Sequence, residues 1–80
     1  MDIDRMALDA GSEMKGVPHR PGTREYCYCE QGQVVVWAGG ERFELKDGDV
    51  LSFQGDQAHS YRNESRTKAV LFSVVTLAPV

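Results

Sequence analysis

The residues of this 80-residue chain that could do chemistry fall into two short sets of polar side chains. The first set spans residues 19–25, begins with a histidine and ends with a glutamate, and is followed by Gly32. The second set begins at residues 48–53 and continues with His59 and Asn63. An imidazole or carboxylate that a fold buries needs a partner, because an unpaired polar group in the interior is costly. Both sets are therefore candidate site residues.

The thiols and hydroxyls of the chain are weaker candidates for a functional site. Cys27 and Cys29 lie in an aromatic stretch that predicts a strand, where residues two apart share a face with parallel side chains. That geometry disfavours a disulfide, so we expect two reduced, buried thiols in a reducing compartment. A thiolate metal site is less favoured because the chain has no second cysteine pair. Ser52 and Ser60 lack the glycine-rich elbow and the third partner of a nucleophile triad.

The size and charge of the chain limit the classes of protein it can belong to. A mass of 8.9 kDa allows one domain, over residues 1–80. A net charge of −3 argues against a nucleic-acid-binding module, and no apolar run reaches the length of a membrane span. No secretory leader is recognisable, so we expect a cytoplasmic location. A domain this small is marginally stable, which makes a bound metal or self-association attractive as a source of stability.

The elements that must position these residues are strands. No segment shows helical periodicity over three turns, and Gly, Pro, Asn and Asp interrupt the chain at short intervals. The segment from Ala38 to Glu41 contains two adjacent glycines and predicts a hairpin turn. About eight short strands indicate an all-β sandwich or barrel, with expected bounds 3–8, 13–17, 24–30, 33–37, 42–45, 50–53, 58–62 and 68–77.

One strand carries an apolar stripe on the face that the core does not use. If Val34 and Val36 point inward, Val35 and Trp37 point outward together. Either another part of the chain covers this stripe, or it forms the interface of a homodimer. We favour the dimer because the core is small.

The two polar sets resemble the two motifs of the cupin superfamily, G-x5-H-x-H-x3/4-E-x6-G and G-x5-P-x-G-x2-H-x3-N. The segment between them, GQVVVWAGGERFELKDGDVLSF, has the expected length and pattern. This resemblance covers nearly the whole chain and implies a single cupin-type jelly-roll β-barrel. It places His19, Glu25 and His59 at three of the four metal-ligand positions, while the fourth falls on Pro21, which cannot ligate. Other departures from the motifs are Glu13, Gln54 and Asp56 in place of glycine, proline and glycine.

The three remaining ligand positions form a coherent set. Two imidazoles and one carboxylate make up the facial triad that binds Fe(II) and leaves positions open for substrate. The resemblance therefore implies a divalent ion, Fe, Mn, Ni or Zn, at His19, Glu25 and His59. The alternative, which stays open, is that these side chains bind one another and trapped water in a metal-free cavity.

Five further residues are candidates for a ligand pocket. Cys27 shares a strand face with Glu25, so its thiol is expected close to the site. Phe53 and Tyr61 line the barrel, either as packing or in contact with a ligand. Arg20 and Arg24 lie near the barrel mouth, either as solvated charges or as anchors for a carboxylate ligand.

The loop before the second histidine makes the resemblance more specific, because it is similar to one group of cupin domains. Its text, FQGDQAHSYRNES, and the earlier PHRPGTREY are similar to the cupin domain that follows a helix-turn-helix in XRE-family bacterial transcriptional regulators. This similarity implies a non-enzymatic domain that senses a small-molecule effector and dimerises, with DNA binding left to a helix-turn-helix in a longer parent. The alternative is a free-standing metal-dependent cupin enzyme of the dioxygenase or isomerase type. A structural module without a ligand is a third possibility, and it requires an interior filled by side chains.

Overall fold

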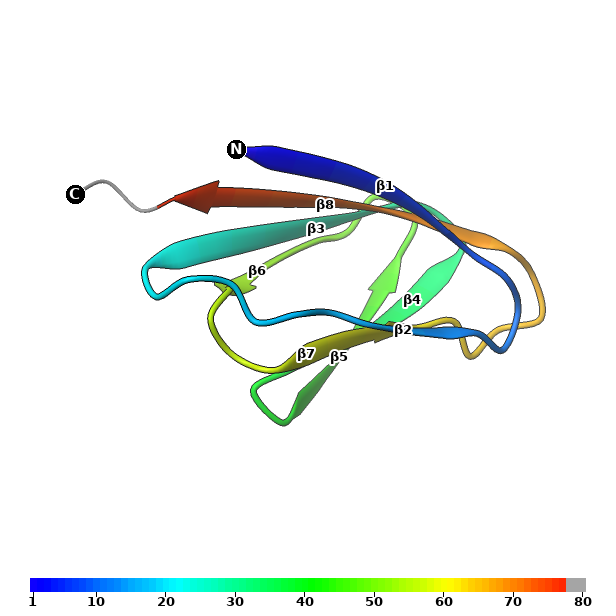
Figure 1. Ribbon diagram of the computed structural model, residues 1–80. Coiled ribbons are helices and arrows are strands. Elements are labelled where there is room, and N and C mark those ends of the chain that lie inside the picture. The colour runs from blue at the N-terminus through cyan, green and yellow to red at the C-terminus, as the bar shows by residue number, and fades with distance from the viewer. Residues whose placement is uncertain (78–80) are drawn as a thin grey trace.

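The computed structural model describes residues 1–77 of the chain, and this part is built entirely from strands and turns (Figure 1). No helix in it is long and apolar enough to cross a membrane. Within these residues the structure forms eight strands: β1 (Asp2–Leu8), β2 (Glu13–Lys15), β3 (Thr23–Gln31), β4 (Gln33–Ala38), β5 (Glu41–Lys46), β6 (Val50–Gln54), β7 (His59–Arg62) and β8 (Ala69–Leu77).

The strands pair into two antiparallel sheets that pack face to face. The first sheet has the order β1-β8-β3-β6 and the second has the order β2-β7-β4-β5. In Figure 1, β1, β8 and β3 lie above β2, β7 and β5. This arrangement confirms the predicted all-β jelly-roll barrel. The predicted bounds hold within two residues at every strand end, and the hairpin turn is formed by Gly39 and Gly40 with φ of 58° and 83°.

The side-chain alternation of β3 explains the interior. Thr23, Glu25, Cys27 and Cys29 point inward and are buried, whereas the residues between them are exposed. The interior along β3 therefore changes from polar near Glu25 to apolar near Cys29, where the core includes Leu8, Val34, Leu45, Ala69 and Leu71. Both cysteines are free and buried, as the sequence predicts.

The apolar stripe on β4 is covered within the chain. Val35 is only 6% exposed, and Trp37 is half-buried. Val35 is flanked in register by Glu44 and Arg62, so their side chains stand on the same face and their aliphatic stems cover it. Ion pairs bind these neighbours together across the face: Arg42–Glu44, Arg42–Glu64 and Arg62–Glu64. The stripe therefore does not supply the open apolar surface on which the dimer prediction rested.

Candidate metal centre

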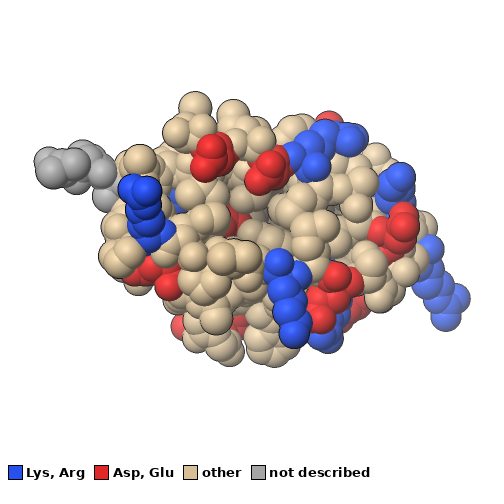
Figure 2. All heavy atoms as spheres, viewed as in Figure 1, with Lys and Arg blue, Asp and Glu red and all other residues tan. Residues whose placement is uncertain are grey.

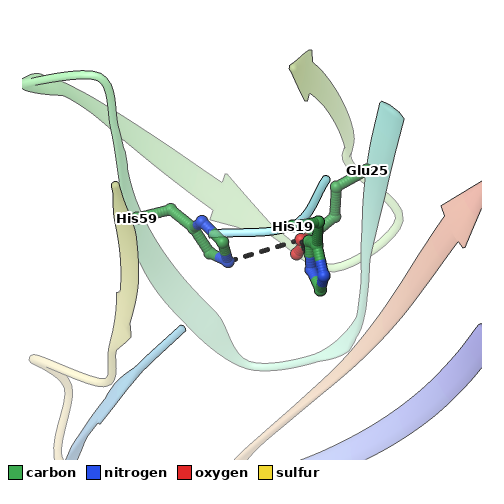
Figure 3. A group of neighbouring side chains, drawn as sticks. All are labelled: His19, Glu25 and His59. Atoms are coloured by element: carbon green, nitrogen blue, oxygen red, sulfur yellow. Dashed lines mark ion pairs between the residues drawn. The ribbon is translucent and has the colours of Figure 1, made fainter. Parts of the chain in front are cut away.

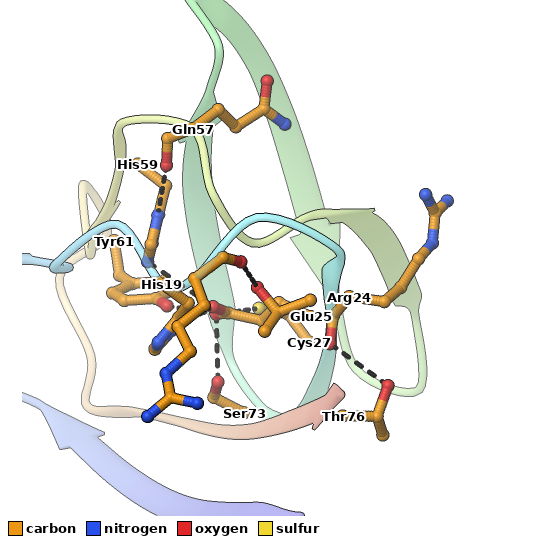
Figure 4. Close-up of polar contacts among 11 residues, drawn as sticks. His19, Arg24, Glu25, Cys27, Gln57, His59, Tyr61, Ser73 and Thr76 are labelled. Atoms are coloured by element: carbon orange, nitrogen blue, oxygen red, sulfur yellow. Dashed lines mark hydrogen bonds and ion pairs between the residues drawn. The ribbon is translucent and has the colours of Figure 1, made fainter. Parts of the chain in front are cut away.

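Glu25 is the centre of the buried polar cluster. Its side chain is fully buried on the inward face of β3. One carboxylate oxygen, Oε2, accepts hydrogen bonds from the Tyr61 hydroxyl, from Ser73 Oγ at 2.9 Å and from Cys27 Sγ at 3.4 Å (Figure 4). These donors come from β7, β8 and β3, so both sheets hold this oxygen in place.

The second oxygen of Glu25 is left without a hydrogen bond. Oε1 is buried and finds no hydrogen-bond partner among the described residues. Its polar neighbours are the Nε2 atoms of His19, at 3.3 Å, and of His59, at 3.4 Å (Figure 3). Neither imidazole aims an N–H at this oxygen with hydrogen-bond geometry. A buried carboxylate oxygen in this state needs a cation or a donor that these three side chains do not supply.

The tautomer of His59 also indicates that Oε1 of Glu25 needs a cation or a further donor. Nδ1 of His59 lies 2.9 Å from the backbone oxygen of Gln57, and a carbonyl oxygen can only accept a hydrogen bond. Nδ1 therefore carries the proton, and in the neutral ring Nε2 presents its lone pair toward Glu25. A histidine that donates its second N–H to a carbonyl is oriented as metal-bound histidines are. The His59 side chain is only 1% exposed, so the surrounding barrel holds the ring in this orientation.

His19 reaches the cluster from the loop between β2 and β3. The backbone N–H of His19 donates to the oxygen of Gly55, and the N–H of Gly55 donates to the oxygen of Thr23. The Thr23 hydroxyl in turn donates to the oxygen of Arg20, which closes the loop on itself. These bonds dock the loop against the β6–β7 connection. The His19 ring stacks on His59 at 5.7 Å between centroids, and its side chain is 35% exposed at the mouth of the barrel.

The three side chains fit a divalent metal. Their ligand atoms all lie within 4.8 Å of one another. Two imidazoles and a carboxylate suit Fe(II), Mn(II), Ni(II) or Zn(II), and three protein ligands leave coordination positions open. Glu25 would bind through Oε1, because Oε2 is already occupied by three donors. A bound ion would act as a Lewis acid for an oxygen-containing ligand.

Burial keeps the groups around Oε2 protonated. Desolvation, followed by the hydrogen bond from the hydroxyl to Glu25 and the negative charge of Glu25, raises the pKa of Tyr61 far above its usual value. Desolvation and the same charge also raise the pKa of the Cys27 thiol. Both groups therefore remain hydrogen-bond donors at neutral pH.

A cavity of about 260 Å³ lies above the cluster. His19, His59, Tyr61 and Ser73 face it, together with apolar side chains that include Met6, Met14, Val17 and Val75. An open cavity of this kind does not match the filled interior that a structural module without a ligand would need.

Of the five predicted pocket residues, Tyr61 lines this cavity, while Cys27 and Phe53 contact the cluster beneath it. Cys27 contacts the carboxylate of Glu25, as its strand face predicts. Tyr61 is more than packing, because its hydroxyl donates to the same carboxylate. Phe53 is buried, with its ring centroid 5.5 Å from that of His59.

The two arginines behave differently from each other. Arg20 lies beside His19 in a depression at the barrel mouth and remains a candidate for contact with a ligand. Arg24 lies on the outer face of β3, where its Nε donates to Ser52 Oγ at 2.8 Å, and its side chain points away from the cluster in Figure 4. The prediction that Arg24 lines the pocket is wrong, because neighbouring residues on a strand point to opposite faces and Glu25 points inward.

Sequence reasoning missed two residues of the site. Ser73 interrupts the apolar run from residue 69 to residue 75, and that interruption is the available signal in the sequence. Gly16 packs against the His59 ring so closely that a Cβ atom at this position would collide with the imidazole. No local sequence feature marks Gly16, because the contact depends on the pairing of distant strands.

Comparison with known proteins is consistent with this fold and site. The Cupin domain family model matches residues 4–75. The structure is similar to the cupin domain of an XRE-family transcriptional regulator from Enterobacter cloacae, with 26% identity, a TM-score of 0.84, and coverage of 98% of this chain and 83% of that one. It is also similar to an HTH_3-family transcriptional regulator from Vibrio cholerae, with 27% identity, a TM-score of 0.83, and coverage of 98% of this chain and 43% of that one.

A quercetin 2,3-dioxygenase of Bacillus subtilis is 40% identical over 47 residues, which are 58% of this chain and 14% of that enzyme. The match thus spans less than a sixth of the length of this curated relative. The family match covers most of the described residues and agrees with the two-sheet topology. The chain belongs to the cupin family.

Proposed function

We propose that this chain is a non-enzymatic, dimeric effector domain of a transcriptional regulator, which binds a divalent metal at His19, Glu25 and His59 and a small molecule above it. The observation that carries the proposal is Oε1 of Glu25, a buried and unpartnered oxygen facing two imidazole nitrogens. The similarity to cupin domains of transcriptional regulators supports the regulatory role. The free, buried thiols are consistent with a cytoplasmic location.

The side chains around the cavity have different roles in binding the metal and the small molecule. The three donors on Oε2 turn Glu25 so that Oε1 faces the two imidazoles. The Gln57 carbonyl fixes the ring of His59, while His19 closes the site from the mouth. The apolar side chains of the cavity wall would exclude water from the apolar part of a ligand, while the cluster, Asp4 and Lys15 offer its polar contacts.

Occupancy of such a site changes the stability of a small domain substantially. A ligand present at a hundredfold excess over its Kd adds about 2.7 kcal/mol. That amount is a large share of the roughly 5–15 kcal/mol by which domains are stable. In a longer regulator, this stabilisation would tighten the barrel and alter the dimer that carries attached helix-turn-helix domains, which would bind the DNA in place of this acidic chain.

The test combines metal analysis with a ligand screen. Protein purified without chelator is expected to contain close to one equivalent of Fe, Mn, Ni or Zn, and His59→Ala is expected to contain little. Amino acids, polyamines and sugars are then screened for a shift of the thermal transition of the metal-loaded protein. Less than about a tenth of an equivalent of metal in the wild type, with no gain on adding these metals, would overturn the proposed site.

A second candidate function is a metal-dependent enzyme of the dioxygenase or isomerase type. The match to a quercetin dioxygenase and the open coordination positions favour it. Oxygen uptake by the metal-loaded protein in the presence of quercetin distinguishes the two functions. Turnover that His59→Ala abolishes would replace the regulatory proposal with the enzymatic one.

A further inference from the structure

The outer face of the first sheet carries an exposed apolar surface. Two rows of cross-strand neighbours occupy its middle: Ile3–Val74–Tyr26–Ser52 and Arg5–Phe72–Tyr28–Val50. Cross-strand partners share a face, so the apolar members of both rows stand side by side. We call this surface the tyrosine face and define it as Ile3, Tyr26, Tyr28, Val50, Phe72 and Val74.

The tyrosine face is open, unlike the covered stripe on β4. Tyr26 and Tyr28 are each 41% exposed, Ile3 is 59% exposed and Val50 is 63% exposed. Among residues 1–77, no strand packs over this side of the sheet. A contiguous exposed apolar surface that spans four strands indicates an interaction site, and tyrosine is enriched at such sites. Figure 2 shows that, on the face in view, charged side chains of both signs are interspersed and do not form a field of one sign.

The charged side chains on β3 favour a second copy of this chain as the partner of the tyrosine face. Arg24, Tyr26, Tyr28 and Glu30 follow one another at every second position on the outward face of the strand. β3 bulges between Cys29 and Gln31, but Glu30 stays on the outer side, 3.6 Å from Arg5, so the order of these side chains is self-complementary about residue 27. A twofold axis that lies in the interface and crosses β3 at that point would set Tyr26 against Tyr28 of the partner copy and Arg24 against Glu30 of the partner copy. We propose that the tyrosine face binds the tyrosine face of a second copy of this chain, with the two β3 strands antiparallel.

The other symmetric arrangement is disfavoured by charge. With the two β3 strands parallel, Arg24 would face Arg24 and Glu30 would face Glu30, and like charges placed opposite each other across an interface cost several kcal/mol. In the antiparallel arrangement, Glu30 lies between Arg24 of the partner copy and Arg5 of its own chain, from which it is 3.6 Å away. The charged groups thus form one mixed cluster at each end of the interface.

The area is sufficient for a modest dimer. Strands of nine residues are about 30 Å long, and four strands are about 14 Å across between the outer axes. Two faces of this size together bury roughly 800 Å², which is less than a standard specific interface, so we expect a weak dimer with a Kd in the micromolar range. This inference deepens the proposed function, because it names the surface through which the effector domain dimerises. The metal ligands do not take part, since Glu25 lies on the opposite face of β3.

Sedimentation equilibrium from about 1 to 300 μM tests the proposal, because this range brackets a micromolar Kd. The wild type is expected to shift from 8.9 kDa to twice that mass as concentration rises. Arg24→Glu and Glu30→Arg are each expected to weaken the dimer about a hundredfold, because the twofold repeats each reversed contact. The double variant is expected to dimerise more tightly than either single variant, since the reversed charges face each other again. It should stay weaker than the wild type, because Glu30→Arg also replaces the ion pair with Arg5 by a like-charge contact.

Controls separate this proposal from the metal site and from misfolding. Arg66→Glu makes the same charge change on an exposed residue away from the tyrosine face and is expected to leave the dimer intact. Metal content, measured for every variant, is expected to stay at the wild-type value. A monomeric wild type over the whole range, no recovery in the double variant, or loss of the dimer in Trp37→Ser but not in Tyr28→Ser would overturn the proposal. None of these results would affect the metal site.

Discussion

Replacing Glu25 by glutamine should stabilise the metal-free protein and remove the stability that metal adds. In the metal-free protein, Oε1 is buried without a hydrogen bond next to the Nε2 lone pair of His59. In Glu25→Gln, the amide NH2 would take the place of Oε1 and donate to that lone pair, while the amide oxygen keeps the donors Tyr61 and Ser73. The variant has the same shape as glutamate and satisfies the metal-free cluster, but it is a poor metal ligand.

The size of the effect follows from the contacts. Leaving a buried acceptor unsatisfied costs about 1–3 kcal/mol, and a new neutral hydrogen bond contributes about 1 kcal/mol. Hydrogen bonds from Tyr61 and Ser73 to a neutral amide are weaker than those to a carboxylate, which offsets part of this gain. We expect a net stabilisation of the metal-free protein of about 1–2 kcal/mol, or roughly 4–16 °C in Tm for a domain of this length. With metal at a hundredfold excess over Kd, the wild type gains about 2.7 kcal/mol and the variant gains nothing.

The assay is urea unfolding of both proteins after treatment with chelator and again after loading with Mn(II) or Zn(II). Glu25→Gln is expected to be the more stable protein without metal and the less stable one with metal. Glu25→Ala serves as the control, because it removes the charge but leaves a cavity and is expected to be destabilised in both states. A metal-free Glu25→Gln protein as unstable as Glu25→Ala, or one that still gains stability from metal, would refute the assignment of Oε1 as a ligand.

Three further predictions use other parts of the site. Tyr61→Phe removes a donor from Glu25 and should weaken metal binding about 10- to 100-fold, measured by competition with a chelating dye. Gly16→Ala should displace the His59 ring and abolish metal binding, whereas Val17→Ala, at the next and exposed position, should retain it. Because burial raises the pKa of Cys27, the folded thiol stays protonated at a pH where the unfolded thiol ionises. The stability contributed by Cys27 is complete below pH 8 and falls by up to about 1.4 kcal/mol per pH unit above about pH 9. Unfolding curves at pH 7–10 should show a shallower decline for Cys27→Ala.

The fold and the meeting of the three candidate metal ligands could both be predicted from the sequence. Short alternating strands with glycine turns predict the all-β fold, and the resemblance to the two cupin motifs implies that His19, Glu25 and His59 meet in the barrel. The strand alternation that puts Cys27 beside Glu25 also turns Arg24 to the opposite face of β3. The position of Arg24 was thus available from the sequence.

Other features depend on pairing between strands that are distant in the chain. Ser73 reaches Glu25 only because β8 pairs with β3 in one register, and a shift of one residue would turn it outward. Val35 is covered because β5 and β7 set long charged side chains on either side of it. The same pattern of residues on an edge strand would be open. The exposed apolar surface proposed for the dimer lies on the other sheet. Alternation along β3 predicts that Tyr26 and Tyr28 point outward, but only the pairing of β1, β8 and β6 brings the other apolar side chains beside them.

Strand β3 joins the two proposals physically, because its two faces belong to different sites. Glu25 and Cys27 point into the cavity, and Tyr26 and Tyr28 point out to the tyrosine face. A change in the backbone of β3 on metal or effector binding must therefore also move the outward side chains. Coupling of this kind is reciprocal, so any factor by which metal tightens the dimer must equal the factor by which dimerisation tightens metal binding. Titrating Mn(II) at protein concentrations below and above the dimer Kd measures both factors, and equal metal affinities at the two concentrations would show that β3 transmits nothing between its faces.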